Sequence, residues 1–196
     1  NGFEVEMNDL GRKLGKSDCL KIFSKYDGII AGTEIFDKPV MDNAKNLKVI
    51  SRVGVGLDNI DMAYAKQKGL TVFKSKTEPS LAVAELVLGL ILNLVRKISL
   101  HNDEMKHGKW DKKMGMLFSG KTLGIIGLGN IGKTLVKITK GLSLKYLAYD
   151  KIKDTEFAKD NGVEYCDLDH LIISSDFISI HLSLTKGSHS LFSDKE

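Results

Sequence analysis

The chain has 196 residues, of which 42% are hydrophobic and 28% are charged. This composition excludes an intrinsically disordered chain, and a net charge of +4 is too weak to predict a nucleic-acid partner. At roughly 150 residues per domain, the length predicts one large domain or two small or incomplete ones.

The two cysteines, Cys19 and Cys166, lie far apart and outside any CxxC or Cys/His cluster. They predict neither a disulfide framework nor a zinc or other metal site, and they favour a reducing compartment, which we expect to be the cytoplasm. Residues 1–5 carry neither the basic start nor the long apolar run of a secretory signal. Because an initiator methionine is also missing, we expect a processed chain or a piece of a longer one.

The first part of the chain alternates short apolar runs with a helical pattern. We expect strands at residues 27–32, 47–53 and 70–73, and a short helix at 60–68 that ends at Gly69. Strands separated by short helices predict βαβ units and a parallel sheet.

A boundary is expected near residues 74–80, where Pro79 and Ser80 are typical of a helix start. The strongly apolar segment 81–98 follows. A membrane span is the alternative interpretation, but the segment is short and polar or small residues interrupt it. A helix buried all round, in a core or a subunit interface, fits better. Residues 101–116 are polar and basic, and we expect them to follow the surface with Trp110 as an apolar anchor.

The remaining sequence again alternates between the two patterns. Strands are expected at residues 122–126, 145–149, 163–165 and 177–181. Helices are expected at residues 133–141, 156–161 and 168–173. The second part of the chain is therefore also predicted to contain a parallel sheet with crossover helices.

A glycine turn, Gly-x-Gly-x-x-Gly, follows the strand at 122–126 and precedes a helix; its residues are Gly127, Gly129, Asn130, Ile131 and Gly132. In a dinucleotide site the first glycine permits the tight turn and the second admits a pyrophosphate to the backbone. The third lets the helix pack close to the sheet, and the amides at the helix start face the phosphates.

Asp150 ends the next strand, 18 positions after Gly132, close to the roughly 20 expected of the acid that binds the ribose hydroxyls. A carboxylate there would repel a 2′-phosphate, so the pattern favours NAD over NADP. Two alternatives remain open. Lys151 and Lys153 could assist a phosphate, and the turn could be a glycine turn without a ligand.

Four segments together resemble the D-isomer-specific 2-hydroxyacid dehydrogenase family, and they occur in the order typical of that family. The segments are residues 51–61, 82–89, 120–132 and 175–185. The resemblance implies an α/β fold of two doubly wound parallel-sheet domains, both incomplete here. Residues 1–76 would form a flavodoxin-like substrate domain, and residues 77–196 a Rossmann NAD-binding domain.

The resemblance also implies an activity, the transfer of a hydride between nicotinamide and C2 of a D-2-hydroxy acid. Backbone amides would bind the substrate carboxylate in the loop Val53, Gly54, Val55 and Gly56, where two glycines expose consecutive N–H groups. Arg52 could bind the carboxylate or a phosphate in a forked contact. The alternatives are a surface salt bridge for Arg52 and a plain strand-ending turn for the glycines.

By the same resemblance, His181 and Thr185 would lie near the ribose or pyrophosphate of the cofactor. The alternative for His181 is a hydrogen-bonded structural histidine. The Arg, Glu and His of the family's chemistry would lie beyond Glu196, so no catalytic residue is assigned, and we expect residues 1–196 alone to be inactive.

Within the family the chain is most similar to the branch that oxidises 3-phosphoglycerate, a step of serine biosynthesis. Reduction of glyoxylate, hydroxypyruvate or another 2-oxo acid is the alternative. An NAD-sensing binding module of the corepressor kind is the alternative from another class. The resemblance implies a homodimer formed through residues 80–118, with neither nucleic acid nor membrane as partner.

Overall fold

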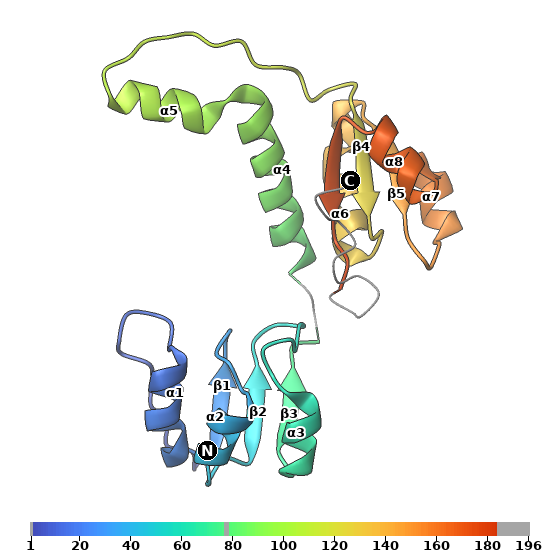
Figure 1. Cartoon of the computed structure of the whole chain (residues 1–196). Coiled ribbons are helices and arrows are strands. Elements are labelled where there is room, and N and C mark those ends of the chain that lie inside the picture. Colours follow the sequence, from blue (N-terminus) through green and yellow to red (C-terminus); the bar gives the residue numbers. More distant parts are fainter. Residues whose placement is uncertain (1, 77–78, 184–196) are drawn as a thin grey trace. The chain divides into compact units, whose positions relative to one another are not determined.

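The computed structural model describes residues 2–76 and 79–183 (Figure 1). The chain divides into two compact units, Asn1–Glu78 and Pro79–Glu196. Each unit contains a parallel sheet with helical crossovers, which confirms the predicted α/β class.

The sheet of the first unit has the strand order β1-β2-β3, all parallel. The strands are β1 (Gly28–Ala31), β2 (Val49–Arg52) and β3 (Thr71–Lys74). The helices are α1 (Lys16–Ile22), the short 3-10 helix η1 (Phe23–Lys25), α2 (Lys38–Asn43) and α3 (Met62–Gln67). Helices α2 and α3 form the crossovers between successive strands, as in a βαβ fold.

The core of the first unit lies on one face of this sheet, where Phe36, Met41 and Ile50 are fully buried. On the other face, Ile30 is 77% exposed and Phe73 is 57% exposed. Parallel sheets are usually covered on both faces. Within the described residues, the helices of this unit cover only one.

The sheet of the second unit has the strand order β6-β5-β4-β7, also parallel. The strands are β4 (Thr122–Ile126), β5 (Lys145–Tyr149), β6 (Val163–Tyr165) and β7 (Phe177–Ile180). The helices that alternate with them are α6 (Asn130–Thr139) with its 3-10 extension η2 (Lys140–Leu142), α7 (Thr155–Asn161) and α8 (Leu168–Ser174).

Both faces of this second sheet are covered. Leu123, Ile125 and Leu135 belong to a core on one face. Ile126 and Leu171 belong to a smaller cluster on the other face, under α8. The second unit is therefore doubly wound, as predicted.

A long helix, α4 (Ser80–Arg96), precedes this sheet and packs against α6. Within a single chain the helix is not buried all round, because Leu86, Leu90 and Leu94 lie exposed along one side, the last at 69%. Burial of this side in a subunit interface stays a prediction. The helix also ends earlier than predicted, at Lys97, whose backbone is left-handed with φ 54°. None of the helices in residues 2–76 and 79–183 has both the length and the apolar character needed to cross a membrane.

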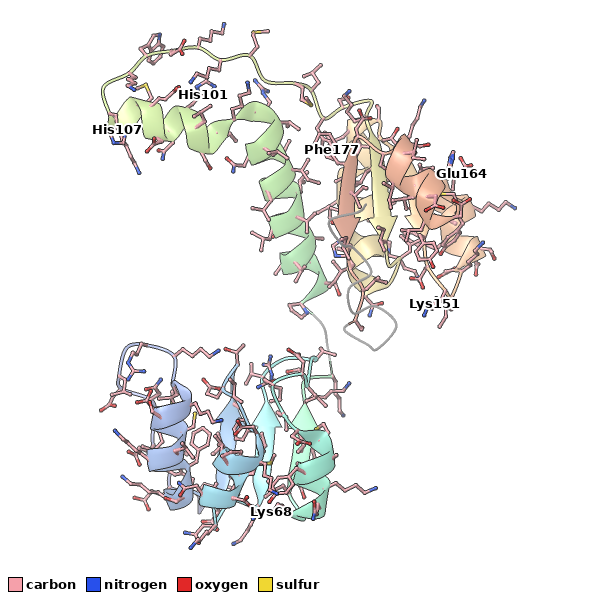
Figure 2. The ribbon with its side chains drawn as sticks, viewed as in Figure 1. Lys68, His101, His107, Lys151, Glu164 and Phe177 are labelled. Atoms are coloured by element: carbon pink, nitrogen blue, oxygen red, sulfur yellow. The ribbon has the colours of Figure 1, made fainter. Side chains whose placement is uncertain are left out.

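The segment after α4 differs from the prediction in two ways. A second helix, α5 (Ile98–Lys106), occupies its first part, with His101 and His107 labelled in Figure 2. The chain then returns towards α4, where the amide of Met116 donates to the carbonyl of Val95 at 2.9 Å. Trp110 is 86% exposed, so it does not anchor the segment within a single chain.

Candidate functional site

Three of the residues singled out in the sequence lie at one edge of the second sheet. Gly127 directly follows β4, Asp150 follows β5 and His181 follows β7. These strands are neighbours and parallel, so their carboxyl ends meet at the same edge (Figure 1). In open α/β sheets, ligands bind at this edge.

The glycine turn has the geometry that each glycine was predicted to provide. Gly127 has φ +94°, and a Cβ there would lie 2.8 Å from the carbonyl oxygen of His181. A Cβ on Gly132 would lie 2.7 Å from the carbonyl oxygen of Gly127, so α6 packs on the turn only because this position has no side chain. At Gly129 nothing lies within 4 Å of the Cβ position, which leaves open space beside the backbone.

Helix α6 begins immediately after Gly129, with Asn130, Ile131 and Gly132 in its first turn. The first amides of a helix have no partner within the helix and carry its positive dipole end. Open space at Gly129 and a helix start at the same place form a cradle for an anion. These residues therefore fit a pyrophosphate group.

The carboxylate of Asp150 is fixed beside this turn by two backbone amides. Leu128 donates to Oδ2 at 2.8 Å, and Ile152 donates to Oδ1 at 3.1 Å. An ionised carboxylate has about four acceptor positions, so each oxygen can accept a further hydrogen bond. Asp150 can therefore accept bonds from ribose hydroxyls without releasing the turn.

The lysines near Asp150 are mostly engaged elsewhere. Lys153 Nζ lies 5.6 Å from the ring centroid of Tyr165. Lys133 Nζ lies 2.5 Å from Asp154 Oδ2. Lys151, labelled in Figure 2, lies in the loop after β5. This arrangement weakens the alternative in which Lys153 assists a 2′-phosphate.

His181 is half-buried, and its Nε2 lies 2.9 Å from the hydroxyl of Ser179. Burial lowers the pKa of the imidazole, so the ring is neutral at pH 7. Ser179 was not predicted from the sequence, although it lies two positions before His181 on the same side of β7. Thr185 lies outside the described residues.

The lowered pKa of His181 predicts a pH dependence of stability. The unfolded chain binds a proton at this histidine near pH 6.5, whereas the folded chain binds it only at lower pH. The free energy of unfolding therefore falls as pH drops below about 6.5. His181→Gln should remove this contribution in urea unfolding measured at a series of pH values. The difference between variant and wild type should be constant above pH 7, and a difference that stays constant through pH 5 would contradict the prediction.

In the loop after β2 of the first unit, two backbone amides form hydrogen bonds to described residues of the unit and the next two do not. The amide of Val53 donates to the carbonyl of Ala31 at 2.8 Å, and the amide of Gly54 donates to Ser75 Oγ at 3.0 Å. Within residues 2–76 and 79–183, the amides of Val55 and Gly56 have no hydrogen-bond acceptor. Of the four residues predicted to bind a carboxylate, these two present unused donors.

Arg52, at the end of β2, lies against the same loop. Its guanidinium donates to the carbonyl of Val53, and it lies so close to Gly54 that a Cβ there would be 2.6 Å from Nη1. Its Nε is buried and has no partner in the described part of the chain. No carboxylate among the described residues forms an ion pair with Arg52, so the salt-bridge alternative has no support.

Comparison with known proteins gives consistent results for the second unit. A family model described as "D-isomer specific 2-hydroxyacid dehydrogenase, NAD binding domain" matches residues 88–196. The match includes the glycine turn, Asp150 and His181.

Curated relatives and solved structures cover most of the chain. Hydroxypyruvate reductase of Thermotoga maritima is 40% identical over 93% of this chain and 60% of its own length. D-3-phosphoglycerate dehydrogenase of Archaeoglobus fulgidus is 38% identical over 95% of this chain and 35% of its own length. A D-lactate dehydrogenase from Aquifex aeolicus, complexed with NAD and lactic acid, is similar with a TM-score of 0.77 and 28% identity, over 90% of this chain and 54% of that one. The chain thus spans between about a third and three fifths of the length of these proteins.

Proposed function

Because the chain belongs to the D-isomer-specific 2-hydroxyacid dehydrogenase family, we propose that the full-length protein is an NAD-dependent oxidoreductase acting on a D-2-hydroxy acid or its 2-oxo counterpart. Residues 77–196 are assigned to cofactor binding, and residues 1–76 to substrate binding. The observation that carries the proposal is the meeting of Gly127, Asp150 and His181 at one sheet edge beside the start of α6.

In this proposal the second unit holds the cofactor through its own backbone and one carboxylate. The amides at the start of α6 bind the pyrophosphate, and Asp150 accepts bonds from the adenosine ribose. Neutral His181, oriented by Ser179, borders the nicotinamide half. NAD supplies or accepts the hydride when it is bound.

The first unit binds the substrate at the loop after β2. The free amides of Val55 and Gly56 face the carboxylate, because consecutive N–H groups in a turn form an anion-binding concavity. The guanidinium of Arg52, which lies against the same loop, gives further donors for an anionic group. We propose 3-phosphoglycerate and 3-phosphohydroxypyruvate as the substrate pair, since Arg52 can serve a second anion. The alternative is that the protein reduces hydroxypyruvate or glyoxylate.

The substrate proposal is tested by NADH oxidation with the full-length protein and equal concentrations of 3-phosphohydroxypyruvate, hydroxypyruvate, glyoxylate and pyruvate. The proposal predicts the highest kcat/KM for 3-phosphohydroxypyruvate. Arg52→Gln should lower kcat/KM for that substrate more than for glyoxylate, which has no second anionic group. A higher kcat/KM for an unphosphorylated 2-oxo acid would contradict the phosphorylated substrate and leave the family assignment intact.

We also propose that the protein is a homodimer formed through residues 80–118. The proposal is supported by the apolar side chains that the described part of this segment exposes, because contact between apolar surface and water is unfavourable. These side chains include Leu81, Leu86, Leu90, Leu94, Ile98, Met105, Met114 and Leu117. Leu86, Leu90 and Leu94 follow one another at four-residue spacing along one side of α4, and monomeric proteins rarely expose large apolar patches. The cytoplasm is the proposed location, in agreement with two free cysteines.

Leu90→Glu is expected to dissociate the dimer, because it places a charge in the middle of the exposed side of α4. The molar mass from light scattering should fall from that of two chains to that of one. Ile152→Glu is the matched control, since Ile152 is also apolar and exposed, at 85% against 58% for Leu90, but lies outside the segment; it should remain dimeric. An unchanged mass for Leu90→Glu, or a monomeric wild type, would contradict this interface.

A further inference from the structure

The loop after β2 is held by hydrogen bonds towards both neighbouring strands, β1 and β3. Towards β1, the amide of Val53 donates to the carbonyl of Ala31. Towards β3, Gly54 and Ser75 exchange two hydrogen bonds. The amide of Gly54 donates to Ser75 Oγ at 3.0 Å, and the amide of Ser75 donates to the carbonyl of Gly54 at 3.1 Å. These bonds end immediately before Val55 and Gly56.

The two bonds between Gly54 and Ser75 have different origins. The bond from the Ser75 amide uses only backbone atoms, so any residue other than proline could form it. The bond to the Ser75 hydroxyl needs a side-chain acceptor. Gly54 lies two residues beyond the end of β2 and has φ +139°, and its amide has no backbone acceptor on β3 among the described residues. The hydroxyl of Ser75 therefore supplies the acceptor that the strand's backbone does not.

Without this hydroxyl, the Gly54 amide would be an unpaired donor next to the guanidinium of Arg52. An unsatisfied amide in a partly buried place is unfavourable, and the loop could relieve it by changing conformation. Such a change would also move the next two amides, those of Val55 and Gly56. Ser75 thus influences the positions of the Val55 and Gly56 amides without bonding to either of them.

We propose that Ser75 is a positioning residue of the substrate site, which fixes the loop so that the amides of Val55 and Gly56 converge on the substrate carboxylate. The expected effect of Ser75 on substrate binding rests on the proposed function. The expected effect on the conformation of the loop rests only on the two hydrogen bonds between Gly54 and Ser75.

Three variants of the full-length protein test this role. Ser75→Ala removes the acceptor but keeps the backbone bond. Ser75→Thr keeps the hydroxyl and should restore the wild-type behaviour. Ser51→Ala is the matched control, because Ser51 lies on β2 one residue before Arg52 but on the opposite face of the sheet, and forms no side-chain hydrogen bond in the described structure.

The first readout is hydrogen exchange of single amides by NMR. Ser75→Ala should accelerate exchange at Gly54 by roughly tenfold, the effect of losing one such bond, and leave Val53 unchanged. The second readout is steady-state kinetics. Ser75→Ala should raise KM for the 2-oxo acid by roughly tenfold and leave KM for NADH within about twofold. Ser75→Thr and Ser51→Ala should match the wild type in both.

Unchanged exchange at Gly54 in Ser75→Ala would overturn the proposal whatever the enzyme does. Faster exchange with an unchanged KM for the 2-oxo acid would also overturn it, since the loop would then be free without consequence for the substrate. If the wild type reduces no 2-oxo acid, the proposed function fails and the kinetic part of the inference fails with it, while the exchange data still report on the bond.

Discussion

Gly132→Ala is expected to weaken NADH binding at least tenfold and to lower the free energy of unfolding by about 1–3 kcal/mol. The added methyl group would meet the carbonyl oxygen of Gly127 at 2.7 Å and Ile125 Cγ2 at 3.0 Å. Neither atom can move away cheaply, because one is backbone and the other belongs to the core. Helix α6 must therefore shift from the turn, and its amides move with it. Fluorescence titration with NADH and urea unfolding measure the two effects.

Gly129→Ala separates binding from packing. Its Cβ would enter open space, and its backbone is extended, so stability should stay at the wild-type value. The methyl group would occupy the space into which the pyrophosphate must fit, so NADH binding should still fall about tenfold or more. Gly141→Ala, also in open space but away from the turn, should change neither quantity. Wild-type NADH affinity in Gly129→Ala would show that no cofactor approaches this backbone.

Asp150→Ala is expected to raise Kd for NADH by roughly 10- to 150-fold, because a bond from a hydroxyl to a carboxylate contributes about 1.5–3 kcal/mol. The affinity for NADPH should fall much less, since the 2′-phosphate no longer meets a carboxylate. The ratio of the two Kd values, measured by fluorescence titration, is therefore the decisive quantity.

Two further variants distinguish the roles of Asp150. Asp150→Asn retains an oxygen that can accept a hydrogen bond from Leu128 or Ile152. Its free energy of unfolding should therefore be higher than that of Asp150→Ala, while its NADH binding should still be weak. Asp160→Ala removes an exposed carboxylate of α7 and should leave both cofactor affinities unchanged. Equal loss of NADH and NADPH binding in Asp150→Ala would mean that Asp150 only supports the turn.

The fold of the second unit was largely predictable because its signals are local. The glycine turn, the strand before it and the acid after the next strand are all specified within residues 122–150. Short elements of the first unit were missed. Helix α1 has seven residues, which is too few for a helical period to be evident. Helix α2 did carry a signal, since Asp37 caps it and a proline follows within its first turn.

The errors lie where conformation depends on distant contacts. The end of α4 was misplaced because Lys97 takes a left-handed conformation that its side chain does not favour. Trp110 was expected to anchor its segment on the surface, but within a single chain it is 86% exposed. The bond between Gly54 and Ser75 joins positions 21 residues apart, and only the register of β2 with β3 brings them together.

The most direct test of the cofactor site is an equilibrium titration of the full-length wild-type protein with NADH and, separately, with NADPH. The arrangement of the glycine turn, the start of α6 and Asp150 predicts saturable binding of NADH, with a Kd at least tenfold lower than that for NADPH. Absence of saturable NADH binding, or a lower Kd for NADPH, would contradict it.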